Sequence, residues 1–181
     1  MAEQRSVHLT GNERTFSENS FLVSKTDIKG RITYVNRVFI DVSGYTEKEL
    51  LGRPHNLIRH PHMPRCVFKL FWETIASGQE MFAYIVNRCK NGDHYWVFAH
   101  VTPSFDSNGN VCGYHSNRRV SDRSVVQTVI TPLYKTLREE EARHASSKDG
   151  MAAAGALLQD HVRKKGMSYE QYVLALGHPA S

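Results

Sequence analysis

Residues 54–64 form an irregular stretch, punctuated by three prolines, that concentrates side chains able to do chemistry. His55, His60 and His62 carry imidazole nitrogens, which are common metal ligands. Their spacing, however, matches neither one face of a helix nor a standard zinc motif, and the prolines would have to hold the three rings convergent. The sequence therefore gives a metal site little support.

Arg59 and Asn87 are polar residues that suit ligand recognition. The guanidinium of Arg59 is a planar fork of N–H donors, which fits a phosphate group or a ligand carbonyl. Asn87 lies in a β-prone run, where asparagine is disfavoured, so ligand contact is one explanation for it. Purely structural roles stay open as well. Arg59 could pair with Asp41 or Glu73, and His60 could hydrogen-bond the backbone of its own loop.

Catalytic arrangements are missing from the sequence. We find no nucleophile–base pair on a recognisable scaffold and no phosphate-binding loop, so we expect a protein that is not an enzyme. The three cysteines (Cys66, Cys89 and Cys112) are an odd number and form no Cys-x-x-Cys pair. That usage argues against a disulfide framework or a zinc ribbon and is typical of a reducing, cytoplasmic compartment.

The chain of 181 residues has a formal net charge of +5, but its charge pattern does not favour nucleic acid. Lys and Arg are scattered, and the densest basic string, residues 163–165, is short, as on an ordinary solvated surface. No apolar run approaches the roughly 20 residues that cross a bilayer. Residues 1–20 lack the apolar core of a signal peptide. We therefore expect a cytoplasmic protein without membrane insertion.

The candidate ligand-binding residues must be positioned by secondary structure, and the first predicted elements are a hairpin followed by several helices. Residues 21–26 and 31–35 are β-prone runs on either side of a turn, which predicts two paired strands. Short helices are predicted within residues 36–52. A longer helix is predicted over residues 65–77, where apolar residues recur at helical spacing.

Three further strands are predicted over residues 81–89, 94–101 and 111–120, joined by turns that contain Asn-Gly. Within the second, one alternating set of residues is more uniformly apolar: Tyr95, Val97, Ala99 and Val101. Five strands with helices inserted after the second imply an α+β fold, a five-stranded antiparallel sheet with helices on one face. Such a fold can enclose a pocket between the helices and the sheet.

The chain changes in character after residue 121, where we expect a C-terminal helical extension. An amphipathic stripe recurs every four residues and consists of Val125, Val129, Leu133 and Leu137. Pro132 lies within this stripe and predicts a kink or a break in the helix. The stripe either packs on the sheet or docks a partner, and the sequence leaves both open.

The chain thus divides into three predicted parts. Residues 1–20 form an N-terminal arm or cap, residues 21–121 the α+β domain, and residues 122–181 the helical extension. Within the extension, residues 146–150 are linker-like, and helices are predicted over residues 151–165 and 168–176.

Several motifs resemble a known family. Asp27-x-x-Gly-x-Ile-Thr-Tyr-Val-Asn36, followed by Phe39, Ser43-Gly44-Tyr45 and Glu49–Gly52, resembles the N-terminal half of a PAS domain. Residues 54–64, 87–97 and 132–135 are similar to PAS domains of the aerotaxis-receptor type. Arg59, His60 and Pro61 match the Arg-His-Pro-Asp motif of that group. His62 departs from its Asp, and Met81 stands where a Trp is common.

The resemblance implies a PAS sensor domain that holds FAD non-covalently and reports redox state or oxygen through the oxidation state of the flavin. We expect the chain to signal to a partner in a chemoreceptor or kinase pathway through its C-terminal helices, and to form a homodimer. Its ligand-binding residues would be Arg59, His60, His62, Asn56, Asn87, Trp72, Trp96 and Tyr84. Their polar groups would contact the flavin, and their rings would wall the cavity.

Two other functions remain compatible with the sequence. One is a PAS interaction module without a ligand, whose pocket is filled by its own side chains. The other is a gas sensor that binds haem through a single histidine. A photochemical flavin–cysteine adduct is disfavoured, because residues 55–59 contain no cysteine where light-sensing relatives have one.

Overall fold

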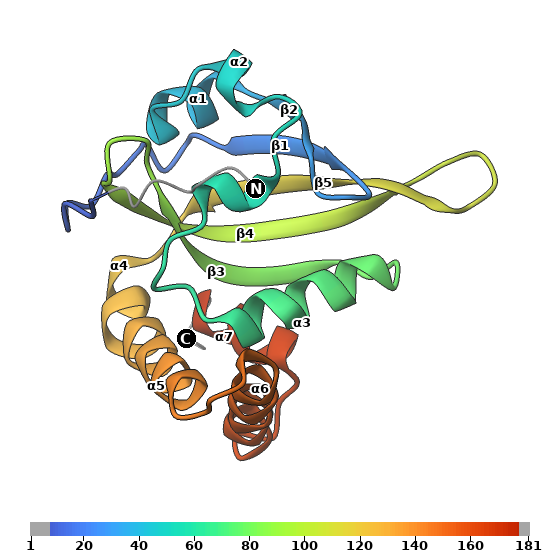
Figure 1. Cartoon of the computed structure of the whole chain (residues 1–181). Helices are drawn as coiled ribbons and strands as arrows, with labels where there is room; N and C mark the ends of the chain where they lie inside the picture. Colours follow the sequence, from blue (N-terminus) through green and yellow to red (C-terminus); the bar gives the residue numbers. More distant parts are fainter. Residues whose placement is uncertain (1–7, 178–181) are drawn as a thin grey trace.

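The computed structural model describes residues 8–177, and a five-stranded sheet forms its centre (Figure 1). The strands lie in the order β2-β1-β5-β4-β3, and each is antiparallel to its neighbours. Their bounds are Leu22–Asp27 for β1, Ile32–Val35 for β2, Met81–Arg88 for β3, His94–Phe105 for β4 and Val111–Val120 for β5. The predicted antiparallel sheet is confirmed.

Four helical elements lie between β2 and β3. They are α1 (Arg37–Ser43), α2 (Glu47–Leu50), the 3₁₀-helix η1 (His55–Ile58) and α3 (Arg65–Ala76). Side-chain hydrogen bonds at the N-termini define where α1 and α2 begin. The Asn36 side chain accepts a hydrogen bond from the Phe39 N–H, and Thr46 and Glu49 form a capping box.

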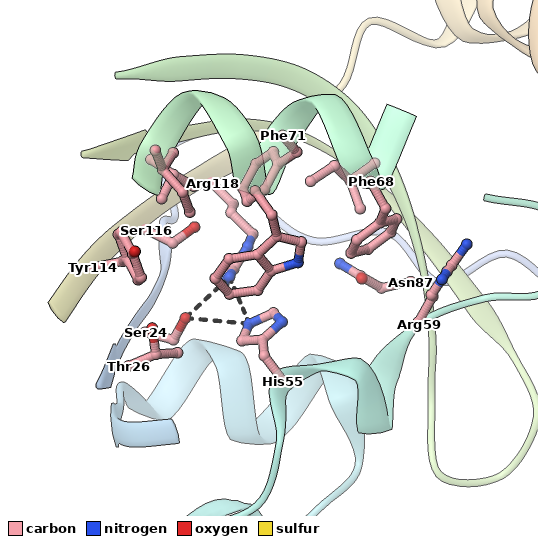
Figure 2. Close-up of a pocket in the computed structure, with 14 residues that line it drawn as sticks. Ser24, Thr26, His55, Arg59, Phe68, Phe71, Asn87, Tyr114, Ser116 and Arg118 are labelled. Atoms are coloured by element: carbon pink, nitrogen blue, oxygen red, sulfur yellow. Dashed lines mark hydrogen bonds between the residues drawn. The ribbon is translucent and has the colours of Figure 1, made fainter. Parts of the chain in front are cut away.

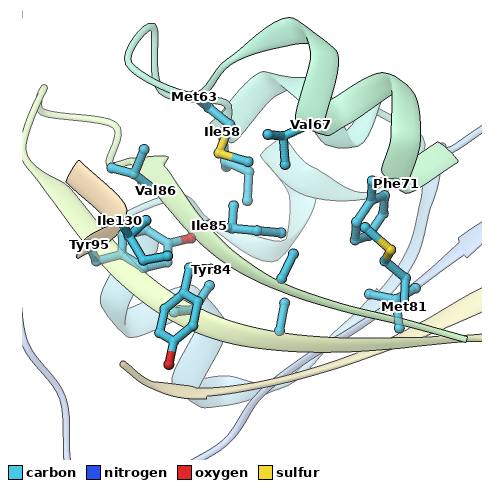
Figure 3. Close-up of a cluster of buried hydrophobic side chains, with 14 of the residues drawn as sticks. Ile58, Met63, Val67, Phe71, Met81, Tyr84, Ile85, Val86, Tyr95 and Ile130 are labelled. Carbon is cyan, nitrogen blue, oxygen red and sulfur yellow. The ribbon is translucent and has the colours of Figure 1, made fainter. Parts of the chain in front are cut away.

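Alternation along the strands gives the sheet two faces. Tyr95, Val97, Ala99 and Val101 of β4 are all buried, as their alternation predicts. They belong to the same hydrophobic cluster as Ile58 of η1 and Val67 of α3 (Figure 3). The face that these residues share, which η1 and α3 cover, is called the inner face below.

The C-terminal extension is one group of helices. Its members are α4 (Arg123–Val125), the π-helical segment η2 (Val126–Ile130), α5 (Thr131–Ala142), α6 (Ser147–Arg163) and α7 (Tyr169–Gly177). The chain does not leave the helix at Pro132, which lies in the first turn of α5, directly after η2. Proline lacks an N–H and crowds the carbonyl four residues earlier, and the wider π-turn accommodates both effects.

Residues 146–150 are not a linker. The Ser146 side chain accepts a hydrogen bond from the Asp149 N–H at 3.4 Å, and α6 begins at Ser147. The sequence contained this start signal, because serine is a preferred N-cap residue and an acidic residue is favourable in the first turn.

The extension packs against the edge strand β3 and against α3 (Figure 1). The Tyr134 hydroxyl donates a hydrogen bond to the Tyr84 carbonyl oxygen at 2.6 Å. The buried side of the η2–α5 helix consists of Val126, Ile130, Tyr134 and Leu137. Leu137 of the predicted stripe is therefore buried, whereas Val125, Val129 and Leu133 are only partly buried beside the core.

Residues 8–20 lie along the β3–β4 hairpin. The Thr10 hydroxyl donates to the Asp93 carboxylate at 2.6 Å, and Arg14 pairs with the same carboxylate at 3.1 Å. The described part of the N-terminal arm is therefore attached to the domain, and residues 1–7 lie outside the described residues. Within residues 8–177, no helix has the length and apolar character needed to cross a membrane.

Candidate ligand-binding cavity

A cavity lies between α3 and the inner face of the sheet (Figure 2). The sheet wall is largely polar, with Ser24, Thr26, Asn87, Ser116 and Arg118. The opposite wall is apolar and mostly aromatic, with Phe68, Phe71, Trp72 and Ile75 of α3. The sheet also contributes Ile85, Val101 and Tyr114, and His55 of η1 and Arg59, which follows η1, complete the lining.

Strand register produces the polar wall. Ser24 of β1 pairs with Ser116 of β5, and Leu22 of β1 pairs with Arg118 of β5. Because every second side chain of a strand points to the same face, Ser116 and Arg118 both point inward. Two strands far apart in sequence thus place hydroxyl and guanidinium groups side by side.

Trp72 closes one side of the cavity. Its indole extends from α3 to the β1–β2 turn, where a Cβ on Gly30 would lie 2.8 Å from the ring. Gly30 also has a positive φ of 72°, so a glycine is required there on two grounds. The cavity volume is about 40 Å³, which is room for a few water molecules.

Four buried polar atoms of the lining find no hydrogen-bond partner within the protein. They are Thr26 Oγ1, Asn87 Nδ2, Ser116 Oγ and Arg118 Nη1. Leaving a buried polar group unpaired costs roughly 1–3 kcal/mol. Four such atoms in one cavity indicate that a bound molecule with polar edges, or water, completes the site.

Arg59 lies at the junction of the cavity with a second, outer groove. Its guanidinium carbon lies 4.4 Å from the centre of the Phe68 ring, and its Nη2 donates to the Met63 carbonyl oxygen at 3.1 Å. Neither predicted acidic partner binds it, because Asp41 pairs with Arg37 and Glu73 pairs with Lys69. Burial lowers the pKa of the Arg59 guanidinium from its ordinary value.

The outer groove lies between the residues that precede α3 and the end of α5. Its volume is about 690 Å³, and its polar lining includes Asn56, Arg59, Arg65, Arg138 and Glu141. Asn56 is therefore placed in this groove rather than in the inner cavity. Arg59 lines both spaces, so a ligand that extends from one to the other passes this side chain.

His60 and His62 do not point into the inner cavity. The Nδ1 atom of His60 accepts a hydrogen bond from the His62 N–H at 3.1 Å, which is the loop-capping alternative considered above. The His60 ring lies 4.7 Å from that of His62 and 5.6 Å from that of His94. Burial, then the neighbouring His62, lower the pKa of His60 to about 4. Neither histidine lines the inner cavity, whereas His60 lines the outer groove together with Arg59.

The placement of Tyr84 and Trp96 in the cavity wall is corrected by the structure. Tyr84 pairs with Phe98 and Trp96 pairs with Val86, so both side chains leave the face that Asn87 and its partner Tyr95 occupy. Trp96 lies beside Tyr134 of the extension, with ring centres 6.1 Å apart. The reason is that successive side chains of a strand point to opposite faces of the sheet, and Tyr84 and Trp96 occupy positions on the face opposite to that of Asn87 and Tyr95.

Several polar cavity residues were not among the predicted ligand-binding residues: Ser24, Thr26, His55, Ser116 and Arg118. The period of two along a strand would place Ser116 and Arg118 on the same face, but the sequence alone does not mark that face as buried. Of the residues predicted to bind the ligand, Trp72, Arg59 and Asn87 line the cavity.

Histidine and cysteine side chains contribute little to the cavity lining. Within residues 8–177, no group of three or more His, Cys, Asp or Glu side chains is placed to hold a metal ion. His55 is the one histidine among the described cavity residues, and its Nε2 atom lies 2.8 Å from Arg118 Nη2. Cys66, at the start of α3, is outside the cavity lining.

Comparison with known sequences places the fold in a family. A profile of the family described as PAS fold matches residues 32–118, which include every cavity residue except Ser24 and Thr26. The aerotaxis receptor of Escherichia coli (strain K12) is 40% identical over 131 residues, 72% of this chain and 25% of the receptor. The nitrogen fixation regulatory protein of Klebsiella pneumoniae is 26% identical over 160 residues, 87% of this chain and 31% of that protein. The chain thus spans about a third or less of these relatives.

Solved structures agree with the fold. The dark structure of the blue-light photoreceptor Aureochrome1 LOV has a TM-score of 0.55 at 23% identity and covers 64% of this chain and 86% of its own. The structure described as "Flavin Analogue Sheds Light on Light-Oxygen-Voltage Domain Mechanism" has a TM-score of 0.55 at 19% identity, covering 68% and 88%. At these identities the likeness shows the fold alone.

Proposed function

The chain belongs to the PAS fold family through residues 32–118, and from that premise we propose that it is a sensor module that binds FAD non-covalently in the inner cavity. The module reports redox state or oxygen to a signalling partner through its C-terminal helices. The observation that carries the proposal is the set of four unpaired buried polar atoms opposite an aromatic wall.

The cavity residues fit a flavin in their chemistry. A flavin ring is flat and aromatic, with polar atoms along its edge, so it needs an apolar slot with a few convergent polar groups. Phe68 and Phe71 supply the apolar side, while Asn87 and Arg118 supply donors from the sheet. When bound, a flavin supplies reversible electron transfer. The name of the aerotaxis receptor supports a sensor role for the module.

The outer groove favours a dinucleotide over a smaller flavin. Arg59 lines both the inner cavity and the groove, and its fork of donors suits a phosphate. Asn56 and Arg65 line the groove next to it. We assign the pyrophosphate of FAD to these residues and the ring to the inner cavity.

Trp72 controls whether the ring fits. With a cavity volume of about 40 Å³, the ring enters only when the indole leaves its position against Gly30. The side chain is half-buried, and the rotation has to break its edge-to-face contacts with Phe71 and Tyr114. In the loaded protein Trp72 becomes part of the ring's surroundings.

Two contacts connect the cavity to the extension. The Glu141 carboxylate of α5 accepts a hydrogen bond from the Cys66 N–H, in the first turn of α3, at 2.8 Å. The Tyr134 hydroxyl bonds the carbonyl of Tyr84, three residues before Asn87 on β3. A change of charge in the cavity therefore acts on α5 through both walls. We propose a homodimer that signals to a chemoreceptor or kinase pathway.

A ligand-free interaction module is the second candidate, and the small cavity volume favours it. In that function Trp72 permanently fills the space that a ligand would take. Water would then satisfy the unpaired polar atoms of the sheet wall.

The absorption spectrum of freshly purified protein tests both candidates, followed by chromatography of the cofactor released by heat. Flavin bands with FAD in the released fraction support the sensor, and an Arg59→Ala variant should then retain less FAD than a control change at the exposed Arg53. A colourless protein that takes up no added FAD overturns the flavin proposal and leaves the interaction module. A Soret band would instead identify haem.

A further inference from the structure

Arg118 is a buried cation without an acidic partner. Its side chain is 3% exposed, and it lies on the inner face of β5. Among the ion pairs of residues 8–177, none includes Arg118. Arginine is almost never fully buried unless it is paired, so this position needs an explanation.

Neutral groups hold the guanidinium in place. Its Nη2 atom donates to Ser24 Oγ at 3.0 Å and lies 2.8 Å from His55 Nε2 (Figure 2). Burial, then the charge of Arg118, lower the pKa of His55 to about 3, so the imidazole is neutral and accepts this hydrogen bond. Burial lowers the pKa of Arg118 only to about 10, so the guanidinium keeps its charge at neutral pH.

The other terminal nitrogen is free to act on a ligand. Arg118 Nη1 is buried and has no partner within the protein, and the neighbouring Ser116 Oγ is also unpaired. Both residues line the inner cavity. A full positive charge therefore sits in the cavity wall with one unused pair of donors. A negative charge on the ligand would balance it at low dielectric, where the attraction is strongest.

We propose that Arg118, oriented by Ser24 and His55, is the counter-ion for negative charge on the ring of the bound flavin and favours its reduced, anionic state. This inference rests on the proposed function and assigns to Arg118 the setting of the reduction potential. Reduction of the bound flavin would add two electrons from an external reductant and one proton from water to the oxidised, neutral ring. The ring then carries one negative charge, opposite the one positive charge of Arg118.

The test measures the two-electron reduction potential of bound FAD in the full chain, by titration with dithionite against reference dyes. Arg118→Gln should weaken binding of reduced flavin relative to oxidised flavin by tenfold or more, which lowers the potential by about 30 mV or more. Arg118→Lys keeps the charge and should restore part of the difference. The matched control is Arg119→Gln, because Arg119 is the exposed neighbour on the same strand and carries the same charge.

The outcomes separate this inference from the proposed function. Equal potentials in Arg118→Gln and Arg119→Gln overturn the role of Arg118 while FAD binding stands. A wild-type chain that binds no flavin overturns both. If Arg118→Gln does not fold or loses the flavin, Ser24→Ala removes one of the two groups that orient Arg118. Its potential should fall by a smaller amount, and an unchanged potential there would overturn the proposal.

Discussion

His60, like His55, is a histidine whose burial makes the stability of the fold depend on pH. Its side chain is 4% exposed, and the titratable groups around it include His62, His94, Arg138 of α5 and Arg88 of β3. Burial comes first among the causes that lower its pKa from 6.5 to about 4. The folded protein therefore disfavours protonation of this ring, and the unfolded chain binds the extra proton more readily.

The folded state should lose stability as pH falls from about 6.5 toward 4. A group with a depressed pKa in the folded state contributes its full stability above the unfolded pKa, and at pH 5 the loss is on the order of 2 kcal/mol. His60→Gln should flatten this part of the profile. Urea denaturation of both proteins at pH 7 and pH 5 measures the difference. If the wild type and His60→Gln lose the same free energy of unfolding between pH 7 and pH 5, His60 does not cause the loss.

The sequence allowed only part of the cavity lining to be predicted, because some lining residues belong to local motifs and others do not. Arg59 and Trp72 lie in or beside motifs that are local in the chain, and Asn87 is conspicuous as a polar residue in a strand. Arg118 acquires its role from β1 and η1, which contribute Ser24 and His55. No local pattern reports such a long-range pairing. Tyr84 and Trp96 were assigned by residue type, and strand parity excluded them.

Helix α3 depends on another element for its start. Its N-cap position is Pro64, which has no side-chain hydrogen bond to offer. The Glu141 carboxylate of α5 instead accepts from the Cys66 N–H at 2.8 Å, and a negative charge at a helix N-terminus is favourable. The helix that forms the apolar wall of the cavity is thus capped by the extension.

Glu141→Ala should destabilise the chain by about 1 kcal/mol, the usual effect of losing an N-cap. Chemical denaturation gives the free energy, and hydrogen exchange should rise in the first turn of α3. Glu139→Ala is the control, because Glu139 is on the same helix, exposed, and paired only with Lys135 at 3.9 Å. Equal losses in the two variants would show that the contact with Cys66 contributes nothing of its own.

The crossing of α5 and α6 requires a glycine. A Cβ on Gly150 would lie 2.4 Å from the Glu141 carbonyl oxygen, so an alanine there forces the helices apart. Gly150→Ala should cost about 1–3 kcal/mol, as overpacking of a core does. Gly155 lies in the same helix with nothing within 4 Å of its added Cβ. Gly155→Ala should therefore stabilise the chain by about 0.5–1 kcal/mol. Thermal denaturation of the two variants measures their melting temperatures. If Gly150→Ala and Gly155→Ala shift the melting temperature in the same direction, the requirement for a glycine at position 150 is contradicted.

At the scale of the whole molecule, the extension leaves an apolar strip partly exposed at its surface. Val125, Val129 and Leu133 are partly buried beside the core, while the opposite side of the same helix is fully packed. The amphipathic pattern alone did not distinguish these sides, because Leu137 of the predicted stripe is buried and its first three members are not. A strip of this kind is self-complementary about a two-fold axis, which fits the proposed homodimer.

Val129→Glu should shift the full chain from dimer to monomer. A carboxylate in the middle of the strip leaves a charge without a partner at the interface, and removing it from water is costly. Size-exclusion chromatography with light scattering measures the mass as a function of concentration. Gln127→Glu is the control, because Gln127 is exposed on the same helix and gains the same charge. If Val129→Glu keeps the wild-type mass and the wild-type partner binding, the strip serves only intramolecular packing. The route from cavity to partner would then run through α6 and α7, which pack on α3 and β3.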